Sequence, residues 1–71
     1  MVNDKPNFVY EEHTHPETAL LVFINGSVQV DINGEKYNCT RGDKILIPGG
    51  IKHSGIVGKL GCTYFWSEKI I

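Results

Sequence analysis

Apolar and polar residues alternate along much of the chain with the period of β-strands. Val28, Val30 and Ile32 alternate with polar residues, which is the pattern of a strand that buries one face. A continuous apolar run over residues 20–24 fits another strand. Further strands are expected over residues 8–12, 35–39, 44–47, 53–57 and 62–67. The pattern contains no amphipathic helix of useful length.

Gly and Asn residues separate the expected strands. The pairs Asn25-Gly26 and Asn33-Gly34 have the composition of tight hairpin turns. Further turns are expected over residues 40–43, 48–50 and 58–61. Short strands at spacings of roughly 8–12 residues, with turn residues between them, are typical of a sandwich or a barrel. We therefore predict a single all-β domain over residues 1–71, without a linker.

Composition narrows the possible partners and the cellular location. Hydrophobic residues make up 41% of the chain and charged residues 21%, as in ordinary globular proteins. The net charge is -1 and the basic residues are scattered, so neither nucleic acid nor an anionic membrane is an expected partner. The longest apolar run, Ala19–Ile24, is too short to cross a bilayer. The polar N-terminus lacks a secretion signal, so we expect a cytoplasmic protein with Cys39 and Cys62 as free thiols.

The chain's 3 histidines have a spacing that suits a metal site. His13 and His15 are two positions apart, so on a strand both side chains point to the same face. His53 lies far away in sequence, as a third ligand from another strand would. Three neutral imidazoles suit transition metals and leave coordination positions open for water or substrate. The spacing alone also fits histidines that bind no metal.

Two longer motifs add to the histidine pattern. From His13 the sequence reads HTHPETALLVFING, and from Gly42 it reads GDKILIPGGIKHSGIV. These segments, residues 13–26 and 42–57, resemble the two motifs of the cupin superfamily, usually written G-x5-H-x-H-x3,4-E-x6-G and G-x5-P-x-G-x2-H-x3-N. The residues in register are Gly26, Gly42, Pro48, Gly50, His13, His15 and His53.

The resemblance implies a fold and a cofactor. The fold is a small cupin-type β-barrel, a jelly-roll-like double-stranded β-helix. The cofactor is one divalent transition metal ion (Fe, Zn, Ni, Cu or Mn), held by His13, His15 and His53.

The first motif departs from the family pattern at one important position. Ala19 stands where cupins usually carry a metal-ligating glutamate. Three histidines without a carboxylate resemble the site of thiol dioxygenases, whereas other cupins that have lost ligands bind no metal. Glu17 is the local acid that would replace the missing ligand, but Pro16 favours a turn that faces solvent. A metal site of three histidines and a barrel that has lost its metal therefore both stay open.

The alternation of the last strand predicts a cavity near the metal. The residues expected to line it are Phe23, Val28, Val30, Ile47, Cys62, Tyr64 and Trp66. The alternative is that these side chains only fill the core of a small barrel. Phe65 and the Ile70-Ile71 tail would then be exposed, which predicts a homodimer.

Two functions compete on this evidence. One is a metal-dependent enzyme of oxygenase or isomerase type that acts on a small molecule, with Tyr10 or Tyr64 as the candidate acid or base. The other is a non-catalytic module that binds or senses a metal or a small ligand, similar to the cupin domains of sugar-responsive transcription factors. A purely structural barrel is a third possibility. The fold does not decide among them.

Overall fold

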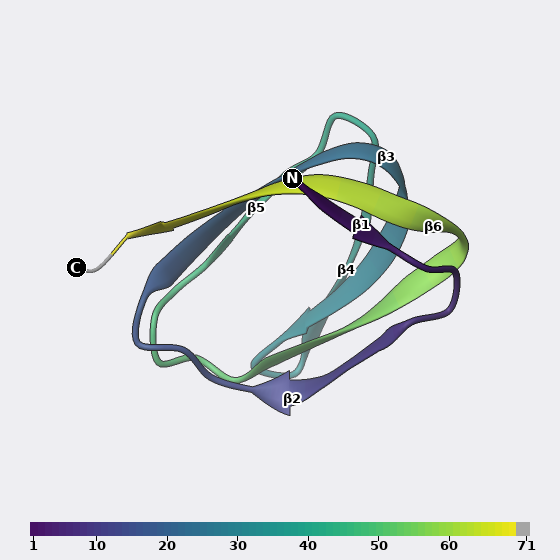
Figure 1. Ribbon diagram of the computed structural model, residues 1–71. Helices are drawn as coiled ribbons and strands as arrows, with labels where there is room; N and C mark the ends of the chain where they lie inside the picture. The colour runs from purple at the N-terminus through teal and green to yellow at the C-terminus, as the bar shows by residue number, and fades with distance from the viewer. Residues whose placement is uncertain (70–71) are drawn as a thin grey trace.

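A computed structural model describes residues 1–69 (Figure 1). The described residues form six strands and no helix, which confirms the all-β prediction. The strands are β1 (Val2–Asp4), β2 (Val9–His13), β3 (Thr18–Ile32), β4 (Glu35–Thr40), β5 (Lys44–Ile47) and β6 (His53–Lys69). None of these described residues belongs to a helix that is long and apolar enough to cross a membrane.

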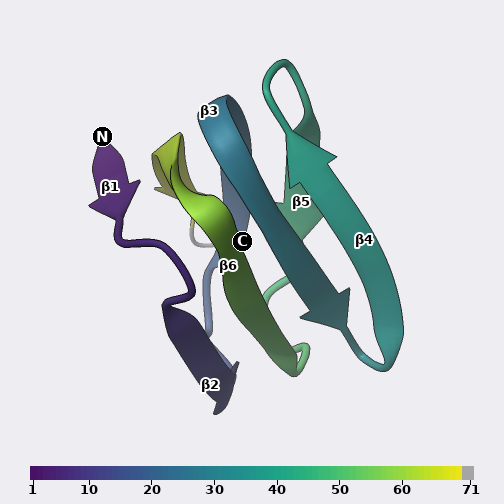
Figure 2. The same ribbon diagram turned by 90° about the vertical axis from the view of Figure 1, so that its right-hand side faces the viewer.

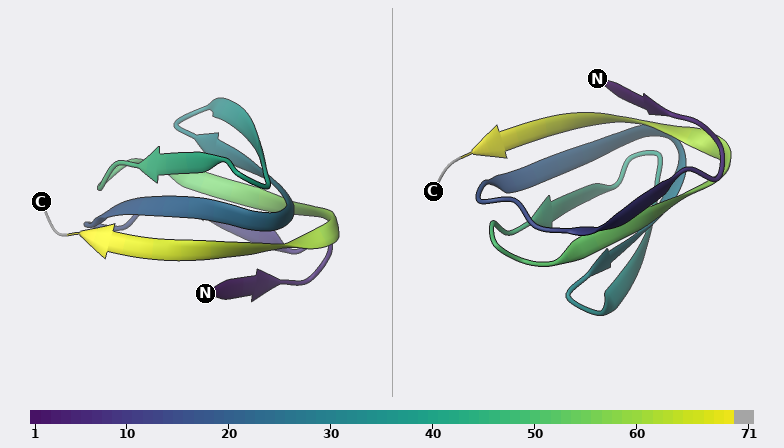
Figure 3. Two further views of the ribbon diagram at one scale, coloured as in Figure 1. Left: turned by 90° about the horizontal axis from the view of Figure 1, so that it is seen from above. Right: turned by 60° about the horizontal axis from the view of Figure 1, so that its bottom comes forward.

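Two long strands organise the sheet. β3 and β6 pair antiparallel along most of their length, and the shorter strands join them at their outer edges. β1 and β2 pair with β6, whereas β4 and β5 pair with β3. Figure 2 shows β1, β6, β3 and β4 side by side in this order, and Figure 3 shows the start of β3 beside the end of β6. The strands curl round a common interior (Figure 1).

The structure corrects two predicted turns. Asn25-Gly26 lies inside β3, and residues 58–61 lie inside β6, so each predicted strand pair is one long strand. The pairing of β3 with β6 shifts register on both sides of Gly26, where the strands bend. Gly26 and Gly61 both have positive φ, 76° and 77°. A Cβ atom on Gly26 would overlap the backbone carbonyl of Gly61, so the bend needs glycine at this contact.

The bend changes which residues face inward. Before it, the buried residues of β3 have odd numbers, Ala19, Leu21 and Phe23; after it, they have even numbers, Val28 and Val30. The same change from odd to even numbers occurs along β6. There His53, Gly55 and Val57 are buried before the bend, and Cys62 and Tyr64 after it. An inserted residue lets each strand keep an apolar interior on both sides of the bend.

The other turns follow their local sequence. Asn33 and Gly34 have φ of 51° and 91° and connect β3 to β4 as a two-residue hairpin, as predicted. At the next turn, the Thr40 backbone N–H donates to the Asp43 carboxylate at 2.8 Å. β1 was not predicted, because its residues are polar and few. It forms because Val2 pairs with Tyr64 at the edge of β6.

Both cysteines are free and buried. Burial raises the pKa of Cys62 to about 11 and also raises the pKa of Cys39. Both thiols therefore stay protonated at neutral pH and pack as small apolar groups.

Replacing Gly26 by Ala tests the bend. A left-handed backbone already costs about 1–2 kcal/mol for a residue with a Cβ atom, and the overlap with Gly61 adds to that cost. The matched control is Gly34→Ala, since Gly34 also has positive φ but has open space around it. Urea denaturation should show a larger loss of unfolding free energy for Gly26→Ala than for Gly34→Ala. Equal losses would mean that the close approach to Gly61 does not matter.

Candidate metal centre

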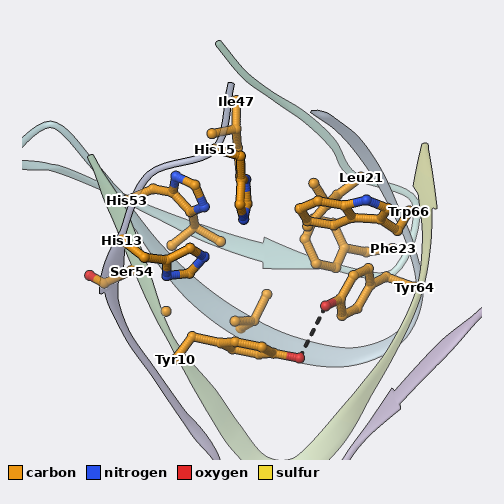
Figure 4. Close-up of a pocket in the computed structure, with 13 residues that line it drawn as sticks. Tyr10, His13, His15, Leu21, Phe23, Ile47, His53, Ser54, Tyr64 and Trp66 are labelled. Atoms are coloured by element: carbon orange, nitrogen blue, oxygen red, sulfur yellow. Dashed lines mark hydrogen bonds between the residues drawn. The ribbon is translucent and has the colours of Figure 1, made fainter. Parts of the chain in front are cut away.

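The structure brings the 3 histidines together at one side of the interior (Figure 4). His13 ends β2 and pairs directly with His53, the first residue of β6. His15 follows two residues after β2. One ring nitrogen from each histidine lies within 4.8 Å of the others, and the ring centroids are 4.3–4.7 Å apart. Three imidazoles at this separation present their nitrogens to a common point.

The turn before β6 holds the His15 segment in place. The Gly50 N–H donates to the carbonyl of His15 at 2.7 Å, and the Gly49 N–H donates to the Thr18 hydroxyl at 3.1 Å. A Cβ atom on Gly49 would overlap the Pro16 carbonyl, so the two backbones touch. These contacts explain why two motifs that are distant in sequence meet at the histidines.

Hydrogen bonds fix the tautomers of two imidazoles. The Nδ1 atom of His13 lies 2.6 Å from the Glu11 carbonyl, and that of His53 lies 3.1 Å from the Ile51 carbonyl. A carbonyl oxygen only accepts, so Nδ1 carries the proton in both rings and the Nε2 lone pair is free in the neutral form. Metal-ligating histidines in proteins are oriented by the same kind of backbone contact.

His53 is the most constrained of the three. It is 6% exposed, and its Nε2 atom is buried without a hydrogen-bond partner among the described residues. Burial lowers the pKa of His53, and the imidazoles of His13 and His15 lower it further, although the bond to Ile51 opposes this. The ring is therefore neutral at pH 7. A buried, unpaired lone pair is unfavourable unless a cation or a donor satisfies it.

No carboxylate belongs to this cluster within the part of the chain that the structure describes. Glu17 is half-buried and is not in the group. Ala19 is fully buried, with Ile47 of β5 and Glu68 of β6 as its strand partners. The cluster therefore offers neutral nitrogen ligands alone.

A cavity of about 160 Å³ extends from the histidines between the two halves of the barrel (Figure 4). Every residue expected to line it does so except Cys62. Cys62 is buried at the bend opposite Gly26, two residues before Tyr64, which does line the cavity. Apart from the three histidines, the remaining lining residues are Tyr10, Leu21, Ser54 and Gly55. Most of the lining is apolar, and the Trp66 ring meets the His15 ring edge to face at 5.5 Å between centroids.

Two phenols supply polar atoms away from the histidines. The Tyr10 hydroxyl donates to the Asp4 carboxylate, with both oxygens at 2.7 Å, and lies 3.1 Å from the Tyr64 hydroxyl. Burial and the bond to Asp4 raise the pKa of Tyr10, and burial raises the pKa of Tyr64. Both phenols therefore stay protonated near neutral pH, which suits hydrogen bonding rather than action as a base. The role of Asp4 was missed because β1 was not predicted.

Comparison with known proteins assigns the family. The model of the AraC-like ligand binding domain matches residues 2–68. The chain belongs to this family. Its members are cupin-type domains, so the cupin resemblance and the small cupin barrel are both confirmed.

Similar proteins include enzymes that are much longer than this chain. The acireductone dioxygenase of Granulibacter bethesdensis is 44% identical over 46 residues, which cover 59% of this chain and 26% of that protein. The chain thus spans about a quarter of that relative. A structure of oxalate decarboxylase from Bacillus subtilis has a TM-score of 0.85 at 26% identity, covering 96% of this chain and 19% of the other. An RmlC-like cupin from Shewanella frigidimarina has a TM-score of 0.87 at 16% identity, covering 97% and 61%.

The hydrogen-bonded, half-buried phenol of Tyr10 predicts a loss of stability at alkaline pH. The pKa of Tyr10 in the folded chain is raised above its ordinary 10.0, so above pH 10 the unfolded chain releases a proton that the folded chain retains. The contribution of Tyr10 to the free energy of unfolding is therefore fully present below pH 10 and is lost as the pH rises further. The loss is at most about 1.4 kcal/mol per pH unit for this proton. Urea denaturation between pH 8 and pH 11 should give a smaller decline for Tyr10→Phe than for the native protein. An unchanged decline would show that the Tyr10 phenol ionises as freely in the folded chain as in the unfolded one.

Proposed function

We propose that the chain binds one divalent transition metal ion through His13, His15 and His53 and holds a small molecule beside it. The observation that carries this proposal is the buried, unpaired Nε2 atom of His53 next to two further imidazoles. Neutral imidazole suits zinc, copper, nickel and iron(II). Three protein ligands leave coordination positions open for a ligand from solution.

The cavity suits the body of a small organic molecule. Leu21, Phe23, Val28 and Val30 contribute apolar walls that exclude water, and the imidazoles lie on one side of the space. A bound metal ion would supply Lewis acidity, and iron would also supply redox chemistry. The protein groups bind and orient the ligand and keep water away from its apolar part.

Two activities follow from such a site. Similarity to a dioxygenase and a decarboxylase supports a metal-dependent enzyme of oxygenase type. The AraC-like ligand binding domain match supports a module that binds a ligand without chemistry. Oxygen uptake distinguishes the enzyme from the non-catalytic module. The measurement uses iron(II)-loaded protein with acireductone as the probe substrate. Uptake above that of free iron supports the enzyme, and its absence together with ligand binding supports the module.

Removing two imidazoles tests the metal site. His13→Ala combined with His15→Ala leaves a single nitrogen ligand, so bound zinc should fall from one ion per chain to a trace. Elemental analysis after gel filtration of tag-free protein measures this ratio. Glu17→Gln is the control and should retain one ion, because Glu17 is not part of the cluster. Full zinc occupancy in the double variant would place the metal elsewhere, and loss in Glu17→Gln would make that carboxylate a ligand.

We also propose that two copies pair through an apolar outer face. Leu20 of β3 lies opposite Leu46 of β5, and Val22 lies opposite Phe65 of β6, so these side chains are neighbours on the outside of the sheet. Leu20, Leu46 and Phe65 are 38%, 58% and 48% exposed. An exposed apolar patch on so small a chain favours an interface. The Ile70-Ile71 tail, on which the sequence prediction also relied, lies outside the described residues.

Light scattering coupled to gel filtration at micromolar concentration tests the pairing. The native protein should have twice the chain mass of 7.9 kDa, and Leu46→Glu should have the mass of one chain. The matched control is Leu60→Glu, because Leu60 is 90% exposed but lies in the bend of β6, outside this face. A monomeric native protein would contradict the proposal, as would a Leu46→Glu variant that remains a dimer.

A cytoplasmic location stays a prediction of the sequence.

A further inference from the structure

The cavity has polar atoms at two separate places. The imidazoles of His13, His15 and His53 lie on one side, and the hydroxyls of Tyr10 and Tyr64 lie across the space from them (Figure 4). The intervening wall is apolar. A ligand that fills the cavity therefore meets the metal site with one end and a phenol with the other.

The direction of the phenol hydrogen bonds is fixed by Asp4. A carboxylate only accepts, so the single proton of the Tyr10 hydroxyl is donated to Asp4. Tyr10 then has no proton left for Tyr64, and the contact between the two hydroxyls requires Tyr64 to be the donor. The Tyr64 proton is used as well. Its oxygen keeps acceptor capacity, and no group among the described residues donates to it.

The Tyr64 oxygen therefore offers an acceptor beside a mostly apolar cavity. Tyr64 is 6% exposed and lines the cavity. A hydroxyl that donates along a chain ending in a carboxylate becomes a stronger acceptor, since each bond polarises the next. A buried acceptor of this kind favours a ligand that donates to it and disfavours one that presents another acceptor.

We infer that the cavity selects a compact molecule that coordinates the metal at one end and donates a hydroxyl proton to the Tyr64 oxygen at the other. This inference rests on the proposed function, because the metal anchors the first end. A neutral hydroxyl is favoured over an ammonium group, whose charge would be costly to bury among apolar walls. The cavity of about 160 Å³ limits the ligand to on the order of ten non-hydrogen atoms.

Matched carboxylates test this preference in zinc-loaded protein. The probes are 3-hydroxypropanoate, 4-hydroxybutanoate and 5-hydroxypentanoate, each compared with the carboxylate in which a methyl group replaces the hydroxyl. Succinate carries an acceptor at the distal end instead. The single tryptophan, Trp66, lines the cavity, so its fluorescence reports occupancy without a catalytic assay. At one chain length the hydroxyl compound should bind at least about five-fold more tightly than its methyl partner, and succinate should bind weakly.

Two isosteric variants separate hydrogen bonding from a merely structural role. Tyr64→Phe should abolish the hydroxyl preference while it retains the methyl compounds. Tyr10→Phe removes the acceptor to which Tyr64 donates, so the Tyr64 proton becomes available. This variant should therefore gain affinity for succinate, which a loss of packing would not produce. Zinc content and circular dichroism confirm that each variant is loaded and folded.

The outcomes distinguish this inference from the proposed function. If the native protein binds no zinc, the proposed function fails and this inference falls with it. If zinc is bound but no hydroxyl compound is preferred at any length, or none of the probes binds, the inference alone is overturned. It is also overturned if the preference persists in Tyr64→Phe or if Tyr10→Phe gains nothing for succinate.

Discussion

The chain encloses an interior because its two long strands bend at the same level, where Gly26 of β3 lies against the backbone of Gly61 in β6. The bend divides the sheet into two halves that face each other across the core. Each strand also changes the parity of its inward residues there, so both halves turn an apolar face inside. A side chain at Gly26 would meet the Gly61 carbonyl, separate the two long strands and open the barrel.

The cavity is a consequence of this arrangement, since each half contributes a different chemistry. The half formed by β2, the start of β6 and the end of β3 supplies His13, His53 and Tyr10. The other half supplies Tyr64 and Trp66 from the end of β6. The Gly49-Gly50 turn then ties the His15 segment to the start of β6 and completes the cluster. With Ala19 in the core, all ligands in the cluster are neutral, so a divalent ion would keep its full charge for a bound small molecule.

Local sequence patterns predicted part of this structure well. They failed where contacts between residues far apart in sequence determine the conformation. Asn33-Gly34 forms the expected hairpin because its neighbours pair with each other. Asn25-Gly26 carries the same signal but lies within a strand, because Gly26 packs against the backbone of Gly61, which is far away in sequence. The alternation in the last strand gave the correct inward face, yet it placed Cys62 at the cavity because alternation does not show where the bend falls.

The candidate site likewise has parts that the sequence predicts and parts that depend on contacts between distant residues. The histidine cluster followed from two spaced motifs, whereas the spacing of His13 and His15 alone left the metal undecided. Tyr10 was considered as an acid or base, but the Asp4 contact that sets its hydrogen-bond direction depends on the unpredicted pairing of β1 with β6. Only the folded chain brings these groups together.

X-ray absorption at the zinc edge tests the central claim most directly. Protein purified without a histidine tag and loaded with zinc should contain one ion per chain. The spectrum should show three imidazole ligands at about 2.0–2.1 Å, with the remaining coordination filled by oxygen. Zinc well below one ion per chain would contradict the account, as would a spectrum with sulfur ligands or with fewer than three imidazoles.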